Sequence, residues 1–136
     1  MPPSLFAFAF AGATATAMAD TLSSEIGGLY DDPRLVTTLR RVEPGTDGAI
    51  TWQGEVAGLA GALVVGGIAA VGMPVGDPVD GGGIVVLAGV VGMTVDSLLG
   101  ALVEGDRIGN QAVNFLATLS GAIVAVGVWA ALGTGI

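Results

Sequence analysis

Two aspartates stand inside long apolar segments of this sequence. Asp20 follows a run, starting at Pro3, that contains no charged residue, and Asp96 lies seven residues before the end of the apolar stretch 82–103. An ionised side chain well inside a membrane span costs on the order of 3 kcal/mol or more, so it usually faces a cavity and has a partner. Both are therefore candidate site residues. The alternative for Asp96 is a hydrogen bond to a neighbouring helix that serves packing alone.

Helical spacing relates further carboxylates to these two aspartates. Glu104 lies two steps of four residues beyond Asp96, which places both on one face of a helix. Glu25 lies five residues beyond Asp20, about 140° around an ideal helix. One ion can meet both acids only if the helix ends or distorts near residues 27–28.

A third set of polar side chains opens the last apolar stretch. Asn110, Asn114 and Thr118 recur at steps of four, so they share one helix face. Asparagine can coordinate a hard cation or bind a phosphate. It can equally form a hydrogen bond between helices.

The composition predicts the element that must position these residues. The chain of 136 residues is 52% hydrophobic and only 12% charged, and its mean hydropathy is +0.81. Four apolar stretches are long enough to cross a bilayer core of about 30 Å as helices: 5–26, 50–73, 82–103 and 112–132. We therefore expect an all-α fold, a polytopic membrane helix bundle of about four transmembrane helices, forming a single integral membrane domain over residues 1–136. The spacing of Gly54, Gly58 and Gly61 predicts close helix packing in the second helix.

The connections between these helices differ in charge. The long polar loop 29–48 holds three of the four arginines, and Arg107 lies in the last connection. With four crossings, both connections fall on one side of the membrane. The positive-inside rule makes that side cytoplasmic, so we expect a multi-pass protein of the cell membrane with its arginine-bearing loops in the cytoplasm.

Carboxylates and arginines on one face indicate a site for Mg²⁺ and phosphate. Magnesium is usually bound by one or two carboxylates, waters and substrate phosphate oxygens. Arg34, Arg40 and Arg41 can each bind phosphate in a bidentate fork. The glycine-containing segment 43–49, which includes Thr46, can present backbone N–H groups to a phosphate.

The same composition excludes other chemistry. The chain has no cysteine and no histidine, so a zinc site is not expected and any metal should be a hard ion held by oxygen. A net charge of −8, without lysine, argues against binding to nucleic acid. This acidic excess is typical of a halophile-like protein adapted to high salt, and GC-rich codon usage would produce a similar bias.

Four blocks of the sequence carry a family resemblance. The segments "ATAMADTLSSEIG", "PRLVTTLRRVEPGTDGAITWQGEVAGLAGAL", "VDSLLGAL" and "NQAVNFLATLSGA" resemble the transmembrane protein 19 family, which includes plant phytyl-phosphate kinase. The resemblance implies a multi-spanning helical protein. It also implies transfer of a phosphoryl group from a nucleotide triphosphate to a prenyl monophosphate, such as phytyl or geranylgeranyl phosphate.

The residue types also resemble those of membrane prenol kinases and CDP-diacylglycerol synthases, which use CTP and magnesium. On that analogy Asp20, Glu25 and Asp96 hold the metal, with Asp20, Asp96 and Asn114 as catalytic residues. Phosphate-binding roles fall to the arginines of the loop and to Thr46. The resemblance therefore implies an Mg²⁺-dependent phosphotransferase with a prenyl phosphate lipid and a nucleotide triphosphate, CTP among the candidates, as partners.

Two other functions remain open at this point. Intramembrane aspartate and asparagine also mark ion paths, so an ion-coupled transporter is the main alternative. Members of the resembled family carry further spans before the "ADT" block, so the chain resembles a C-terminal portion. An inactive fragment that needs a partner, the missing N-terminal half or another copy in a homo-oligomer, is the second alternative.

Overall fold

The structure is a computed structural model, and it describes residues 2–103 and 107–132. Four long helices dominate it: α1 (Pro3–Gly27), α2 (Trp52–Gly72), α3 (Pro78–Leu102) and α4 (Asn110–Ala131). All four are long and apolar enough to cross a membrane. The predicted all-α bundle of four membrane helices is therefore confirmed. Glu104 lies outside the described residues, so its predicted place on the Asp96 face is not described.

Local sequence signals set where two of the helices begin. The Thr51 hydroxyl caps α2 by accepting a hydrogen bond from the Gly54 backbone N–H at 3.0 Å. Asp77 caps α3 by accepting from the N–H groups of Val79 and Asp80 at 2.9 and 3.1 Å. Pro78 follows at the first helical position, where its missing N–H costs nothing. This Asp-Pro start extends α3 four residues before the boundary expected from hydropathy alone.

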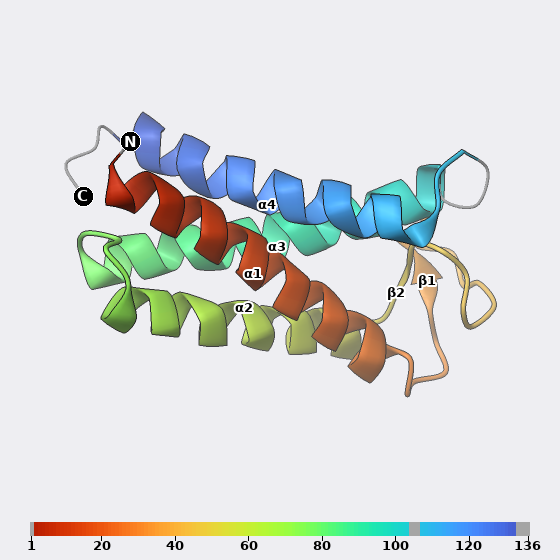
Figure 1. The fold of residues 1–136 in the computed structure, drawn as a ribbon. Coiled ribbons are helices and arrows are strands. Elements are labelled where there is room, and N and C mark those ends of the chain that lie inside the picture. The colour runs from red at the N-terminus through yellow and green to blue at the C-terminus, as the bar shows by residue number, and fades with distance from the viewer. Residues whose placement is uncertain (1, 104–106, 133–136) are drawn as a thin grey trace.

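The helices form an up-and-down bundle (Figure 1). Helices α1 and α3 each contact every other helix, whereas α2 and α4 lie on opposite sides of that pair. The chain between α1 and α2 lies at the same end of the bundle as the end of α3 and the start of α4. The arginine-bearing loop and Arg107 therefore share one end, here called the loop end.

Small residues make up much of the inward-facing surface of this bundle, and many large apolar side chains face outward. The buried face of α1 repeats alanine at steps of four, through Ala7, Ala11, Ala15 and Ala19. Large apolar side chains of every helix are exposed, as Ile68 illustrates. Because lipid solvates large apolar groups well, membrane helices associate through close packing of small residues instead.

Glycines decide the direction in which α1 crosses the bundle. Near the start of α1, a Cβ on Gly12 would lie 2.6 Å from the backbone oxygen of Gly121 on α4. At the loop end, Gly54, Gly58 and Gly61 of α2 are packed against α1 instead. The packing role predicted for these three glycines is confirmed. Helix α1 therefore leans on α4 at one end and on α2 at the loop end (Figure 1).

Two short strands pair within the loop between α1 and α2. Strands β1 (Arg34–Leu35) and β2 (Ala49–Ile50) pair antiparallel, with Arg34 opposite Ile50. The sequence did not indicate these strands, since two residues are too few for a periodicity. The pairing brings the segment before α2 back across the loop end of the bundle.

Candidate functional site

A polar cavity of about 340 Å³ lies at the loop end. Its wall comes from five parts of the chain: the last turns of α1, the residues Gly28, Tyr30 and Pro33 that follow it, the segment 44–51, the end of α3 and the first residue of α4. Asp20 and Asp96 both line it, together with the hydroxyl-bearing Ser23 and Ser97. Residues that lie far apart in the sequence therefore form one oxygen-rich pocket that opens where the helices end.

Asp20 and Asp96 face each other across the two central helices. Their carboxyl groups interact both electrostatically and through a side-chain hydrogen bond. They lie seven residues before the end of α1 and six before the end of α3, about 10 Å inside the helix ends. Oδ1 of Asp96 is buried and has no hydrogen-bond partner among the described residues. The predicted convergence of the two acids is confirmed, and their catalytic role stays a prediction.

The packing one helical turn before the pair explains why the two aspartates lie close together. Thr16 lies one turn before Asp20 and is fully buried, with its hydroxyl 2.9 Å from the Gly12 oxygen and 3.2 Å from the Ala88 oxygen on α3. A Cβ added to Gly92, one turn before Asp96, would collide with the Thr16 side chain. Since only glycine leaves this space, the contact draws α1 against α3 and aligns the next turn of each helix, where the aspartates lie.

The segment 44–51 forms the outer wall of the cavity. Thr46 lies in that wall, as predicted, and donates a hydrogen bond from Oγ1 to the Glu43 carbonyl at 2.6 Å. Gly45 and Gly48 have positive φ values of 87° and 80°, a conformation that side-chain-bearing residues rarely adopt. The Pro-Gly turn seen in the sequence thus covers the polar pocket, and its phosphate-binding role stays a prediction.

Two of the predicted site residues on the helices lie outside this cavity. Glu25 is exposed and does not line it, because α1 continues as a regular helix to Gly27 and turns Glu25 away from Asp20. Asn114 lines a smaller cavity of about 90 Å³ between α1 and α4. The expectation that Asn114 shares the main pocket is wrong, because Asn110, one turn earlier on α4, takes that place.

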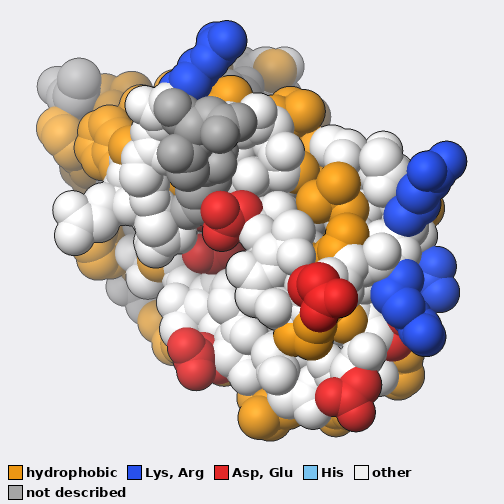
Figure 2. Space-filling view, turned by 90° about the vertical axis from the view of Figure 1, so that its right-hand side faces the viewer, with side chains coloured by type: hydrophobic (Ala, Val, Ile, Leu, Met, Phe, Trp, Pro, Cys, Tyr) orange, Lys and Arg blue, Asp and Glu red, His pale blue; other side chains and the backbone are white. Residues whose placement is uncertain are grey.

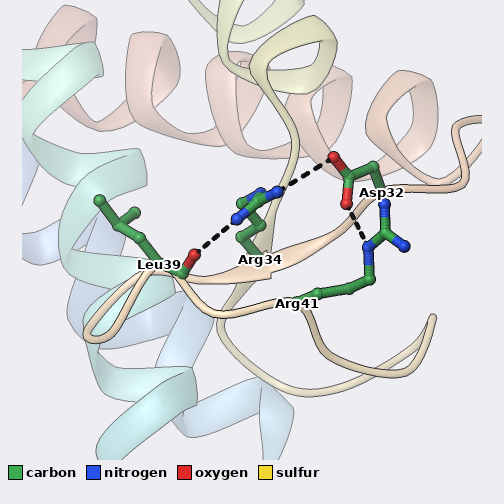
Figure 3. Close-up of polar contacts among 4 residues, drawn as sticks. All are labelled: Asp32, Arg34, Leu39 and Arg41. Atoms are coloured by element: carbon green, nitrogen blue, oxygen red, sulfur yellow. Dashed lines mark hydrogen bonds and ion pairs between the residues drawn. The ribbon is translucent and has the colours of Figure 1, made fainter.

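The arginines of the loop are bound to an acid of the same loop. Asp32 Oδ1 accepts a hydrogen bond from Nε of Arg41 at 2.7 Å, and Asp32 Oδ2 lies 3.5 Å from Nη2 of Arg34. Arg34 also donates to the Leu39 carbonyl at 3.1 Å (Figure 3). The hydrogen bond from Arg41, together with the positive charges of both guanidinium groups, lowers the pKa of Asp32.

These arginines do not reach the carboxylate pair. None of the three, nor Arg107, is among the residues that line the main cavity within the described part of the chain. Figure 2 looks at the loop end and shows arginine side chains at the margins, with acidic side chains between them. Arg40 is exposed and forms no ion pair with the other described residues. The phosphate-binding role of the three loop arginines stays a prediction.

The donor set fits a hard cation. Every side-chain ligand in the pocket is an oxygen, two of them are facing carboxylates, and the orphaned Oδ1 of Asp96 has its electron pairs free. Facing carboxylates repel unless a proton or a cation lies between them. In residues 2–103 and 107–132, no three acidic side chains gather into a metal cluster. A site of two carboxylates completed by water and phosphate oxygens is the kind that Mg²⁺ takes.

Sequence reasoning missed several polar residues at the site. Ser23 lines the cavity and lies 3.2 Å, by its Oγ, from Oε1 of Glu55 in the first turn of α2. Ser97 directly follows Asp96, as Thr21 follows Asp20, so the shared Asp-hydroxyl-Leu pattern was the available signal. The Glu55 contact had no such signal, since it depends on how α1 packs against α2.

Comparison with known proteins places the chain in a family. Residues 2–122 match the family described as "Integral membrane protein DUF92". The chain belongs to the DUF92 family of integral membrane proteins. Multi-pass insertion in a membrane follows from this membership together with the four apolar helices. No solved structure matches the chain.

Three curated proteins illustrate the spread of its relatives. An "uncharacterized membrane protein" of Methanocaldococcus jannaschii is 42% identical over 124 residues, which is 87% of this chain and 49% of the relative. One of a Synechocystis species is 33% identical, over 90% of this chain and 48% of the relative. "Protein VTE6, chloroplastic" of Arabidopsis thaliana is 33% identical, over 90% of this chain and 38% of the relative. This DUF92 chain thus spans less than half the length of these relatives.

Proposed function

We propose that this protein is a prenyl-phosphate kinase-like membrane enzyme, transferring a phosphoryl group from a nucleotide triphosphate to an isoprenyl monophosphate of phytyl or geranylgeranyl type. The observation that supports this proposal most is the Asp20–Asp96 pair in an oxygen-lined cavity at the loop end. The resemblance to the transmembrane protein 19 family and the similarity to the chloroplast protein VTE6 support it further. CTP is one candidate donor.

The position of the pair suits two substrates of opposite solubility. A nucleotide arrives from water, whereas a prenyl chain stays in the bilayer. Carboxylates about 10 Å inside the helix ends, beneath a pocket open at the loop end, lie where a lipid phosphate and a water-soluble phosphate can meet.

The proposed reaction does not need a strong general base from the protein. The second pKa of a phosphate monoester is about 6, so near neutral pH the acceptor is mostly a dianion. One of its oxygens forms the new bond to the γ-phosphorus. The bond from that phosphorus to the bridging oxygen breaks, and the nucleoside diphosphate leaves with the electron pair. A chain without histidine suits such a reaction, which depends on positioning and charge stabilisation.

The residues of the pocket divide these tasks. Asp20 and Asp96 would hold Mg²⁺, and that ion, when bound, supplies positive charge that offsets the phosphates. Thr46 and the backbone of the segment 44–51 would bind phosphate oxygens. Arg40 would approach from the loop as a phosphate partner, since its guanidinium carries no ion pair within the described residues.

An ion-coupled carrier is the second candidate, and one observation favours it. No basic side chain among the described residues lines the cavity beside the two carboxylates. An acidic pocket partway into a helix bundle is also suited to binding an inorganic cation during transport.

One assay separates these candidates. The chain in detergent is given geranylgeranyl monophosphate, Mg²⁺ and each common nucleotide triphosphate in turn, and geranylgeranyl diphosphate is measured. The proposal expects Mg²⁺-dependent diphosphate. A second arm adds the half of the Methanocaldococcus relative that this chain does not match, which tests whether the chain needs a partner. No product in either arm, with cation-dependent uptake into vesicles, would establish the carrier instead.

The orientation in the membrane is a separate proposal. We infer that the loop end is cytoplasmic and that the protein lies in the cell membrane. In intact cells, cysteine at Thr37 or at Arg107 should resist a membrane-impermeant maleimide until the membrane is opened, whereas cysteine at Val79 should react from outside. The chain has no native cysteine to interfere. Labelling of Thr37 from outside would reverse the orientation.

A further inference from the structure

The small cavity between α1 and α4 has a distinctive position. Its volume is about 90 Å³, and its wall includes Asn114, Thr118 and Thr21. Asp20 is the one described residue that lines both this cavity and the main pocket. The two cavities therefore meet at a carboxylate of the proposed catalytic pair.

The crossing of α1 creates this opening. Helices α1 and α4 are in tight contact where Gly12 meets Gly121, and the Thr16 side chain also packs against Gly121. Beyond Thr16, α1 leans toward α2, and the separation from α4 widens toward the loop end (Figure 1). The cavity begins at this divergence, so it opens sideways between two helices rather than along the bundle axis.

One polar side chain at this opening, Asn114, has no hydrogen-bond partner among the described residues. Asn114 is exposed, and its side-chain amide makes no hydrogen bond with another described residue. The hydroxyl of Thr118 donates to backbone oxygens of its own helix at 2.9–3.0 Å. On a membrane-facing surface an unpaired amide is unfavourable, so the two N–H donors of Asn114 are available to a ligand.

The size of the cavity limits which ligands fit into it. A volume of 90 Å³ equals about three water molecules at their share of liquid volume. It admits the first few carbons of a chain, and it does not admit a nucleotide. The main pocket, nearly four times larger at about 340 Å³, suits the phosphates.

We propose that the α1–α4 cavity is the lateral portal through which the hydrocarbon chain of a lipid phosphate leaves the site for the bilayer, with Asn114 donating a hydrogen bond to the phosphate end of that lipid. This inference rests on the proposed function and adds the route of its lipid substrate. The phosphate lies beside Asp20, where the two cavities meet, and the chain passes Thr21 and Thr118 into the membrane.

Single-cysteine protection tests the portal. Asn114→Cys reports on the portal, Thr46→Cys reports on the main pocket, and Phe115→Cys is the matched control. Phe115 neighbours Asn114, is 65% exposed and lines neither cavity. Each variant in liposomes reacts with a lipophilic maleimide, with and without geranylgeranyl monophosphate and Mg²⁺. At ten times its Kd, the lipid should slow labelling of Asn114→Cys about tenfold, and labelling of Phe115→Cys should not change.

The other outcomes separate the portal from the proposed function. Protection of Thr46→Cys alone overturns the portal and leaves the kinase proposal standing. Protection of neither site overturns both. Protection of Asn114→Cys by inorganic phosphate alone overturns the portal in favour of an anion pocket. A disulfide dimer of Asn114→Cys in liposomes shows that a second copy covers the opening, which also overturns it.

A kinetic test follows the same reasoning without cysteine. Thr118→Leu should narrow the portal and raise the KM for geranylgeranyl monophosphate several-fold, with the KM for the nucleotide unchanged. Thr118→Ser, which keeps the hydroxyl and removes a methyl group, should restore the original KM. An equal rise in both KM values would indicate general damage to the bundle and would count against the portal.

Discussion

Two charged regions share the loop end of this bundle and differ in how their charges are balanced. In the loop, Asp32 is bound by Arg34 and Arg41 in an exposed ion-pair cluster. In the cavity, Asp20 and Asp96 face each other, and no basic side chain of the described residues joins them. Both regions thus contain carboxylates, which pair with guanidinium groups in the loop and face each other in the cavity.

The difference indicates which region would be stabilised more by a bound cation. Exposed ion pairs are solvated by water and contribute little to stability, so the loop cluster needs nothing further. Facing carboxylates inside a membrane helix bundle are unfavourable without a counter-charge. The cavity is therefore the region where a cation would change the balance most.

The largest expected effect comes from removing one charge of the cavity pair. Asp96→Asn keeps the shape of the side chain and removes the charge that would hold Mg²⁺. Turnover should fall by more than about a hundredfold. Even the loss of a residue that only supports a metal ligand lowers metal affinity or activity by about 10–100-fold. Asp20→Asn should behave alike. Mg²⁺-dependent formation of prenyl diphosphate is the measurement.

A matched control for this comparison is Glu25→Gln. It removes an acid from α1, the helix of Asp20, at a position that does not line the cavity. Turnover should stay within about twofold, the ordinary scatter of effects for a surface substitution. Unchanged turnover in Asp96→Asn, or equal losses in Asp96→Asn and Glu25→Gln, would remove the metal role from the pair.

A smaller effect is expected from the layer that aligns the pair. In Gly92→Ala, the new methyl group meets Thr16 and should separate α1 from α3. Overpacking of this kind costs about 1–3 kcal/mol of stability, which unfolding in detergent mixtures can measure. Gly83→Ala on the same helix is the control, since no atom lies within 4 Å of its added methyl.

A double variant sharpens this test. Thr16→Ala combined with Gly92→Ala removes the two nearest of the three colliding Thr16 atoms, Oγ1 and Cγ2, and should recover part of the stability lost in Gly92→Ala. Recovery shows that the Thr16 contact sets the separation of the helices. Equal stability of Gly92→Ala and the double variant would show that the cost lies elsewhere.

The loop arginines should matter less than the cavity acids. Arg40→Ala should raise the KM for the nucleotide, with an effect below about tenfold, which is 1.4 kcal/mol. Arg40→Lys should be milder and still impaired if the contact is bidentate. Steady-state kinetics with varied nucleotide is the measurement. A loss of activity as large as that of Asp96→Asn would place Arg40 at the reacting phosphates. The loop and the cavity would then not differ in their importance for activity.

The smallest effect concerns pH and the loop alone. The pKa of Asp32 is lowered in the folded protein by Arg41 and Arg34. Its stabilising contribution is therefore present above the unfolded pKa, about 3.9, and is lost as pH falls through the folded value. Because the activity of pepsin itself changes with pH, the measurement is the ratio of loop cleavage in the native chain to loop cleavage in Asp32→Asn at each pH. The ratio should be below one at about pH 5 and rise toward one below about pH 4, and a ratio that does not change with pH would contradict this expectation.

Much of the fold followed from the sequence because burial in lipid leaves a simple signal. Four apolar stretches of membrane-spanning length predicted four helices, and all four are present. The start of α3 at Pro78 was also readable from its Asp-Pro pair, although hydropathy alone placed it later. The two short strands were not predictable, since their pairing depends on how the loop returns to α2.

The sequence by itself determined which residues carry unusual chemistry: Asp20 and Asp96 stand out because charge in an apolar run is rare. Only the tertiary structure decided which side chains lie next to them. Close packing of Thr16 on Gly92 joins the aspartates, the regular end of α1 turns Glu25 away, and Asp32 holds the nearby arginines. Composition and helical period act along one helix, whereas a site depends on the angle at which helices cross, and small residues on separate helices set that angle.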